Sequence, residues 1–488
     1  MAAELPRLEE MAGRLARSAD RVLVLGMGGS SLAPVVFASS FGPRPGFPRL
    51  EVLDSTHPAS VRAAAGSAPP GRSIYVVSSK SGTTLEPNLF FDFFFDLARK
   101  ELGPRAGERF VVVTDPGTPL EKEARARGVR EIVAGDPAIG GRYSALSPFG
   151  IVPAALSGID VGELLSRAKA AAEACRAAAP EENPGALLGA AIGALALEGR
   201  DKLTFSVSPP IDRFGMWLEQ LIAESTGKEG KGILPVEGEP LGDPDAYGDD
   251  RFFVRIAVEP EPPDPTGKLS RLETGGHPVA RIELTDPLDL AAEMFRWEFA
   301  TAIAGLLIGI DPFDQPNVQE AKDRTNEILA GAGAEAAHGG GTKPRALPDL
   351  LESVRPGDYF AITAYLPSTA ENEERLARVR LPVRDSKRAA TTVGFGPRFL
   401  HSTGQLHKGG PDTGVFLQVT ASVGGDLPIP GRPYGFERVI AAQAAGDLAA
   451  LRSRGRRVLS VDVGDPRTGL DSLAAEVSDS VGRRTVTG

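Results

Sequence analysis

The amino-acid sequence predicts an α/β protein built on parallel β-sheets. Over the first 150 residues, short apolar runs rich in β-branched side chains alternate with segments of helical period. This alternation indicates a parallel sheet covered by helices on both faces. Such sheets bind ligands where the carboxyl ends of strands meet the amino ends of helices, so we expect function at those loops. The expected strands are 22–25, 50–53, 74–77, 110–113 and 131–133, with helices at 31–39 and 85–102.

Two further α/β regions follow along the chain, which at 488 residues is too long for one ordinary core. A helical stretch at 161–197, broken near 180–184, leads into the second region, and the Gly/Ala-rich segment 330–343 predicts a linker before the third. We expect domains at 1–185, 186–335 and 336–488, with the last packed on the second. The expected elements are strand 203–207, helix 212–226 and strands 252–258 and 279–284, then strands 359–366, 391–395, 415–419 and 458–463.

Composition and charge exclude several classes of protein. Apolar residues make up 42% of the chain and charged residues 24%, as in ordinary globular proteins, and the formal net charge is −10. An acidic chain without long Lys/Arg runs binds nucleic acid poorly, because neutralising phosphates needs clustered positive charge. The single cysteine, Cys175, excludes an internal disulfide and a cysteine-based metal cluster. We see no signal peptide and no run of about 20 apolar residues, and therefore expect a cytoplasmic protein.

Two loops at strand–helix junctions have the composition of phosphate sites. The first, GMGGSS at 26–31, offers backbone N–H groups and a helix amino end to an anion. The second, SSKSGTT at 78–84, puts five hydroxyls, a glycine and a lysine into seven residues, and such donors surround phosphate oxygens without a metal. We expect the phosphate on Ser30, Ser79, Ser81 and Thr84, with Gly29, Lys80 and Thr83 beside them.

Each loop also has a plainer interpretation. A strand–glycine–helix turn is often only tight packing. Ser/Thr clusters often cap helices, although capping explains one or two hydroxyls rather than five. Dinucleotide binding is a further alternative, because Asp54 ends the second strand. The spacing Gly26-x-Gly28-x-x-Ser31 lacks the third glycine of that fingerprint, however, and leaves the second loop without a role.

Five blocks of sequence together resemble the phosphoglucose isomerase family. They are the two loops above, GGRYS at 140–144, ESTGK at 224–228, and DPFDQP at 311–316 leading into Lys322. The resemblance covers about residues 20–330 and implies two sugar-isomerase (SIS) three-layer α/β/α sandwiches with parallel sheets, plus a C-terminal α/β region. The blocks are most similar to the isomerase half of bifunctional transaldolase/phosphoglucose isomerases. A transaldolase barrel needs roughly 250 residues, for which the chain before Gly26 has no room, so we expect isomerase activity alone.

The resemblance also implies a set of catalytic side chains. Isomerisation through an enediol needs a base that moves a proton between C1 and C2, and a cation near the developing oxyanion. Glu224, one helical turn after Gln220, matches the base, and Gln220 matches a phosphate contact. Arg142, beside Gly141, stays charged and matches the oxyanion partner, while Lys322 matches a group at the ring oxygen. The alternatives are a solvated glutamate, an arginine that staples a loop, and a lysine that reaches for water.

The histidine is where the chain departs from the family pattern. The family's ring-opening histidine falls between the glutamate and lysine blocks, where this chain has only His277, in a segment unlike the family motif. The segment that does resemble the motif, LHSTGQ at 400–405, contains His401 and lies far downstream of Lys322. We therefore expect the third region to deliver His401 to the sugar, within one chain or across a dimer. A histidine without a role is the alternative.

These observations together predict reversible isomerisation of glucose 6-phosphate and fructose 6-phosphate, as in glycolysis and gluconeogenesis, without metal or cofactor. We expect a small sugar phosphate as the ligand and no nucleic-acid or membrane partner, and we leave a homodimer open. One alternative is another phosphosugar isomerase of this domain class, for a mannose phosphate or an aminosugar phosphate. A non-catalytic phosphosugar sensor is the other. The joint presence of Glu224, Arg142 and Lys322 favours the enzyme, because a sensor need not keep all three.

Overall fold

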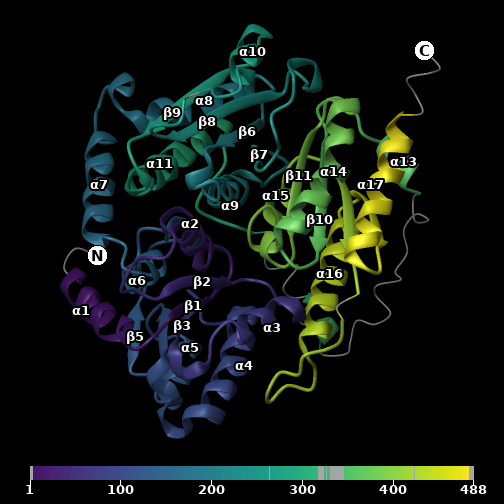
Figure 1. Ribbon diagram of the computed structural model, residues 1–488. Helices are drawn as coiled ribbons and strands as arrows, with labels where there is room; N and C mark the ends of the chain where they lie inside the picture. The colour runs from purple at the N-terminus through teal and green to yellow at the C-terminus, as the bar shows by residue number, and fades with distance from the viewer. Residues whose placement is uncertain are drawn as a thin grey trace.

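The computed structural model describes residues 4–262, 264–316, 324–325, 327–329, 346–422 and 424–482. Within these residues the strands form three parallel sheets, one in each of three successive α/β units that lie beside one another (Figure 1). All three sheets share one scheme, in which the first strand of the unit lies between its second and third strands. The parallel α/β architecture predicted from the sequence is thereby confirmed.

The first unit contains a five-stranded sheet in the order β2-β1-β3-β4-β5. Successive residues of β1 point into opposite cores: Val22 and Val24 belong to one apolar cluster, whereas Leu23 and Leu25 belong to another. This alternation buries the sheet on both faces, as a parallel sheet between helices requires. The strands are β1 (Arg21–Leu25), β2 (Arg49–Leu53), β3 (Ser73–Ser78), β4 (Phe110–Thr114) and β5 (Glu131–Ala134), and the helices are α1 (Leu5–Ala16), α2 (Leu32–Phe41), α3 (Pro58–Gly66), α4 (Leu85–Leu102), α5 (Pro119–Ala126) and α6 (Pro148–Leu156).

The second unit contains a four-stranded sheet in the order β7-β6-β8-β9. Strand β7 escapes the sequence pattern because it has only three residues, with Pro235 in the middle. Its place at the edge of the sheet tolerates a residue that cannot donate a backbone hydrogen bond. The strands are β6 (Lys202–Val207), β7 (Leu234–Val236), β8 (Arg251–Val258) and β9 (Val279–Leu284), and the helices are α7 (Val161–Ala174), α8 (Pro184–Leu197), α9 (Phe214–Thr226), α10 (Lys268–Thr274) and α11 (Leu290–Ile308).

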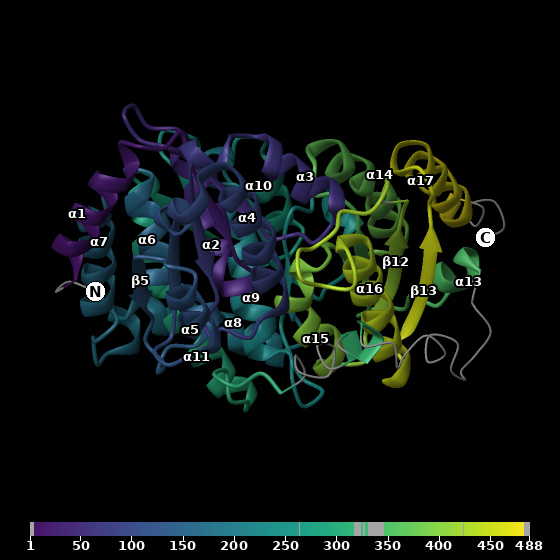
Figure 2. The same cartoon turned by 90° about the horizontal axis from the view of Figure 1, so that it is seen from below.

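The third unit contains a four-stranded sheet in the order β11-β10-β12-β13 and stands at one end of the molecule (Figure 2). It contacts both other units: Leu406 packs in one apolar cluster with Ala223 of α9, and Phe436 stacks on Phe90 of α4 with 6.0 Å between ring centroids. The strands are β10 (Tyr359–Tyr365), β11 (Ala390–Phe395), β12 (Gly414–Thr420) and β13 (Arg457–Asp462), and the helices are α13 (Leu347–Glu352), α14 (Ala370–Lys387), α15 (Gly404–Gly409), α16 (Phe436–Ser453) and α17 (Pro466–Gly482).

Two features expected from the sequence fall where the structure describes no residues. The predicted linker at 330–343 and Lys322 both lie outside the described ranges. The domain boundaries at 185 and 335 stay predictions, although α7, before the first of them, packs along α11 of the second unit. Among the described helices, none is long and apolar enough to cross a bilayer.

Candidate active site

The glycine-rich loop after β1 lies where three loops approach one another. Gly28 has φ +56°, in the left-handed region that favours glycine, and a Cβ there would lie 2.9 Å from the Cβ of His401. A Cβ on Gly29 would lie 2.0 Å from the carbonyl oxygen of Gly141. Larger residues at either position would push the loops apart. The glycines therefore bring this loop, with the buried Ser30, beside Gly141 and His401.

The hydroxyl-rich loop between β3 and α4 buries one of its donors and exposes others. Ser79 is buried, and the described residues offer its Oγ no hydrogen-bond partner. Ser81 is exposed, and its Oγ lies 3.0 Å from Oγ1 of Thr83. Thr84 stands at the N-cap of α4 but makes no side-chain capping bond, so capping does not explain its hydroxyl. Nζ of Lys80 donates to Oδ2 of Asp115 at 2.5 Å.

Helix α9 carries Gln220 and Glu224 one turn apart, and both side chains are buried. Nε2 of Gln220 donates to Oε2 of Glu224 at 3.1 Å, which confirms the shared helix face. Nη1 of Arg142, itself 2% exposed, lies 3.8 Å from Oε1 of Glu224. With only 6% of Glu224 exposed, the alternative of an ordinary solvated glutamate is wrong. A buried carboxylate between a permanent cation and an amide donor has the surroundings of a general base.

Arg142 also holds the segment 311–316 against the site. Its Nη1 donates to Oε1 of Gln315 at 2.7 Å, and its Nη2 donates to the carbonyl oxygens of Pro312 and Asp314 at 2.5 and 2.9 Å. A guanidinium has five N–H donors, so Arg142 staples a loop and approaches Glu224 at the same time. Lys322 follows this segment outside the described residues, and its role stays a prediction.

The structure places His401 of the third unit beside Gln220 within one chain. The carbonyl oxygen of His401 accepts a hydrogen bond from Nε2 of Gln220 at 2.8 Å, and Nε2 of His401 lies 3.1 Å from Oε1 of Glu86. His277 lies elsewhere in the second unit and packs edge-on against two aromatic rings, at 5.9 and 5.5 Å between ring centroids. The third unit thus folds back toward the glutamate, whereas the ring-opening role of His401 stays a prediction.

Comparisons with known proteins agree with this arrangement. Residues 6–233 match the family described as Phosphoglucose isomerase. A protein of Rubrobacter xylanophilus named glucose-6-phosphate isomerase is 30% identical over 393 residues, which span 68% of this chain and 89% of that protein. The protein of the same name from Symbiobacterium thermophilum is 29% identical over 395 residues, spanning 68% and 85%.

The chain belongs to the phosphoglucose isomerase family. Its membership identifies the protein as an isomerase. Two solved structures share the fold. A hypothetical protein of Thermus thermophilus aligns with a TM-score of 0.59 and 26% identity over 67% of this chain and 87% of that one. A glucose-6-phosphate isomerase of Chlamydia trachomatis aligns with a TM-score of 0.56 and 20% identity over 68% and 74%.

The family match covers one part of the candidate site and not another. Residues 6–233 include Arg142, Gln220 and Glu224, which the first two units supply. His401 lies beyond the match, in the third unit. The contact between His401 and Gln220 is therefore a finding of the structure that the family match does not supply.

Glu86 is a residue that sequence reasoning missed. It lies in the first turn of α4, is 4% exposed, and faces His401 with one oxygen that also accepts a hydrogen bond from Nε2 of Gln443 at 2.7 Å. Gln443 in turn accepts from Oγ1 of Thr56 at 2.6 Å. An acid in a first turn is usually explained by the helix dipole, which concealed it. Its place two residues after the hydroxyl-rich loop is the signal that could have revealed it.

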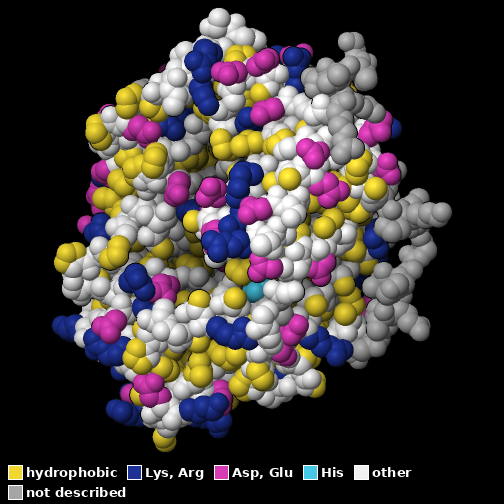
Figure 3. Space-filling model, turned by 45° about the vertical axis from the view of Figure 1, so that its right-hand side comes forward, with side chains coloured by type: hydrophobic (Ala, Val, Ile, Leu, Met, Phe, Trp, Pro, Cys, Tyr) yellow, Lys and Arg dark blue, Asp and Glu magenta, His cyan; other side chains and the backbone are white. Residues whose placement is uncertain are grey.

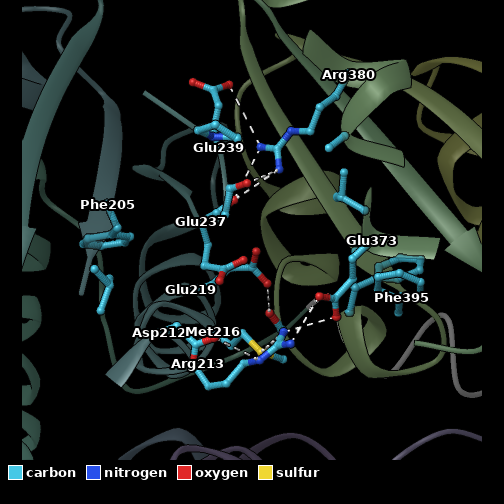
Figure 4. A pocket seen from close by; sticks show the side chains of 18 of the residues that line it. Phe205, Asp212, Arg213, Met216, Glu219, Glu237, Glu239, Glu373, Arg380 and Phe395 are labelled. Carbon is cyan, nitrogen blue, oxygen red and sulfur yellow. Dashed lines mark hydrogen bonds and ion pairs between the residues drawn. The ribbon is translucent and has the colours of Figure 1, made fainter. Parts of the chain in front are cut away.

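A separate cavity of about 410 Å³ lies between the second and third units, close to the isomerase site. Figure 4 shows Arg213 of the second unit and Glu373 of the third, which form an ion pair across the cavity at 3.2 Å, and Glu219 and Glu237 on the side of the second unit. Figure 3 shows basic and acidic side chains gathered near the middle of one face of the molecule. The cavity is lined by Glu219 but not by Gln220 or Glu224, so it lies along a different face of α9 from these two residues.

Proposed function

We propose that this phosphoglucose isomerase interconverts glucose 6-phosphate and fructose 6-phosphate. The observation that carries the proposal is the buried Glu224 with Nη1 of Arg142 at 3.8 Å, on a helix whose Gln220 lies against the glycine-rich loop at Gly28. Proton transfer between C1 and C2 needs a base, and the cation stabilises the negative oxygen that forms when the proton leaves. We also propose that the activity is cytoplasmic and serves glycolysis and gluconeogenesis.

The proposed proton path uses the Glu224 carboxylate in both directions. It takes the proton from C2 of the open-chain aldose, a double bond forms between C1 and C2, and the carbonyl oxygen on C1 becomes negative. One proton passes from the oxygen on C2 to the oxygen on C1. Protonated Glu224 then delivers its proton to C1, and C2 becomes the ketone carbon. Arg142 stays charged throughout, so it stabilises the intermediate without competing for the proton.

The proposed phosphate site is the pair of loops at the carboxyl ends of β1 and β3. Ser79 supports it most directly, because its buried Oγ is unpartnered among the described residues and can donate to a ligand without breaking a bond. Ser30, Ser81 and Thr84 complete the proposed set, with the Gln220 amide nearby. Hydrogen bonds to charged oxygens are the stronger kind, so a few hydroxyls suffice to hold a phosphate.

The proposed ring-opening group is His401, with Lys322 as its partner at the ring oxygen. Cyclic hexose phosphates must open before C1 and C2 can react. The imidazole lies 3.1 Å from the Glu86 carboxylate, which orients the ring and favours a proton on the nitrogen that faces it. Glu86 therefore acts in this proposal through His401, as a positioning residue.

A coupled assay tests the proposal directly. Fructose 6-phosphate is supplied, and the glucose 6-phosphate formed is oxidised by an added dehydrogenase, with and without a chelator. We expect turnover that the chelator does not change, that Glu224→Gln lowers by about 10²- to 10⁴-fold, and that the exposed control Glu476→Gln on α17 leaves intact. Binding of fructose 6-phosphate without turnover would instead indicate a sensor. Turnover of mannose 6-phosphate alone would indicate another isomerase of the class.

A further inference from the structure

The segment 396–404, between β11 and α15, carries His401 and lies at the junction of all three units; we call it the histidine loop. The site described above uses two of its contacts, the hydrogen bond from Gln220 to the His401 carbonyl and the contact of the His401 imidazole with Glu86. Two other contacts, made by Arg398 and Ser402, have no role in the proposed reaction. They connect the loop to the first and second units, which supply the other site residues.

Arg398 connects the histidine loop to the first unit. Its Nε donates to Oδ2 of Asp54 at 2.7 Å, and its Nη2 donates to Oδ1 of the same carboxylate at 2.8 Å. Asp54 is 4% exposed and directly follows β2, the neighbour of the strand that leads into Gly28. Two parallel N–H···O bonds restrict direction as well as distance. Asp54 therefore fixes where the loop meets the first unit. Its carboxylate is engaged by Arg398, which argues against the alternative that Asp54 binds a dinucleotide.

Ser402 connects the histidine loop to the second unit. Its Oγ donates to Oε1 of Glu219 at 3.0 Å, and Ser402 is 3% exposed. Glu219 and Gln220 are consecutive in α9, as His401 and Ser402 are consecutive in the loop. Gln220 holds the His401 carbonyl on the side of the site, and Glu219 holds Ser402 on the side of the cavity in Figure 4. The loop is thus held by two consecutive residues of α9, which lie on adjacent faces of the helix.

We propose that Asp54 and Glu219 are positioning residues for His401, each anchoring the histidine loop to one of the two units that form the isomerase site. The inference rests on the proposed function. His401 comes from a third unit, so any movement of that unit would displace the imidazole from Glu224 and Arg142. A misplacement of about 1 Å can reduce a rate by about 100-fold. Because the loop is anchored to the first and second units, His401 keeps its position relative to the site residues that those units supply.

A merely structural role would be shared by contacts between the same units outside the loop. Arg62 of the first unit offers that control, because it donates to the backbone carbonyls of Gly425 and Asp426 of the third unit at 2.6 and 2.9 Å. If docking of the third unit were all that mattered, Arg62→Met and Arg398→Met would have similar effects. If the anchors position His401, only Arg398→Met should reduce catalysis.

The test compares matched pairs of variants of the full chain. We expect Arg398→Met, Ser402→Ala and Glu219→Leu to lower kcat for fructose 6-phosphate by roughly 10- to 100-fold. Ser402→Thr and Glu219→Gln keep a donor and an acceptor and should restore most of that loss. Binding of 6-phosphogluconate, an open-chain hexose phosphate that cannot isomerise, should stay within about twofold, because the phosphate and base sites are unchanged. Hydrogen exchange of residues 396–404 should rise in the same variants that lose kcat.

Three outcomes would overturn the proposal. They are an equal loss of kcat in Arg62→Met, no rescue by the conservative variants, and unchanged hydrogen exchange in the histidine loop of Arg398→Met. Melting temperatures identify a variant that simply unfolds, and the milder Asp54→Asn then replaces Arg398→Met. If the wild type itself does not isomerise, the proposed function fails, and the exchange data alone judge whether Asp54 and Glu219 anchor the loop.

Discussion

Helix α9 carries two acids five residues apart that face opposite surroundings. Glu224 lies on the side of the isomerase site, with Nε2 of Gln220 at 3.1 Å and a guanidinium nitrogen of Arg142 at 3.8 Å. Glu219 lies on the side of the cavity, where it accepts a hydrogen bond from Ser402 and is near the carboxylate of Glu237. Among the described residues it forms no ion pair. One helix therefore places Glu224 near a cation, and Glu219 where burial and a second acid outweigh the opposing effects of Ser402, Arg380 and Arg398.

The difference shows that the partner, and not the residue type, decides what a buried carboxylate can do. Burial raises the pKa of Glu219 to about 8, and the neighbouring Glu237 acts in the same direction. A carboxyl group in that state keeps its proton near neutral pH and serves as a hydrogen-bond partner. A nearby permanent cation favours the ionised form instead, and the ionised form is the one that can accept a proton from carbon.

Replacing Glu224, the acid that we propose as the catalytic base, should give the largest effect. Glu224→Gln should lower kcat by about 10²- to 10⁴-fold while binding of 6-phosphogluconate persists, because an amide cannot shuttle a proton. The coupled assay measures the first quantity and calorimetry the second. The exposed Glu476→Gln should retain full activity. A Glu224→Gln variant with turnover near that of the wild type would exclude Glu224 as the base.

Removing the imidazole should give the next largest effect. His401→Ala should leave isomerisation of the open-chain fraction intact, because Glu224 and Arg142 remain, but turnover of cyclic fructose 6-phosphate should become limited by spontaneous ring opening. We expect a loss of roughly 100-fold, within the range of general acid–base catalysis. Erythrose 4-phosphate, which cannot form a ring through its phosphorylated oxygen, serves as the control substrate. An equal loss on both substrates would contradict a ring-opening role for His401.

The sequence predicted the face of α9 that carries Gln220 and Glu224, but not the face that carries Glu219. The four-residue spacing of Gln220 and Glu224 predicted a shared face, and their hydrogen bond confirms it. Most strands of the three sheets could also be predicted, because apolar runs and turn residues mark them in the local sequence. Strand β7 could not be predicted, since three residues that include a proline carry almost no periodicity.

Contacts between the units could not be read from the sequence, because they join residues far apart in the chain. Asp54 and Arg398 are 344 residues apart, and Glu86 and His401 are 315 apart. No periodic pattern or motif connects the two positions of either pair. Family resemblance pointed to His401 but not to the acid that faces it. Folding of the third unit onto the first two creates these pairs, and only the three-dimensional arrangement reveals them.

The phosphate loop offers a smaller, sharper test away from α9. Ser79→Ala should weaken binding of 6-phosphogluconate by roughly 1.5–3 kcal/mol, the usual worth of a hydrogen bond to a charged oxygen. The melting temperature should hardly change, because the Ser79 hydroxyl has no partner among the described residues to lose. Ser78→Ala is the matched control, since its hydroxyl is also buried and unpartnered there, but Ser78 is the last residue of β3 and is not one of the residues expected to hold the phosphate. Unchanged affinity in Ser79→Ala would assign the loop a different role.

The smallest expected effect concerns folding stability, and it tests whether Glu219 keeps its proton near neutral pH. Its pKa is about 8 in the folded chain, against an ordinary glutamate value of 4.5, so the folded state keeps a proton that the unfolded state has released. Folding stability therefore decreases as the pH rises from about 4.5 to about 8, and the loss is complete above that range. Glu219→Gln removes this titration, so its melting temperature should match the wild type near pH 4.5 and exceed it by a few degrees at pH 9. Glu476→Gln, which replaces an exposed acid, should show no such divergence in a series of melting curves. A Glu219→Gln variant that melts below the wild type at pH 9 would mean that Glu219 is ionised there and held by favourable contacts.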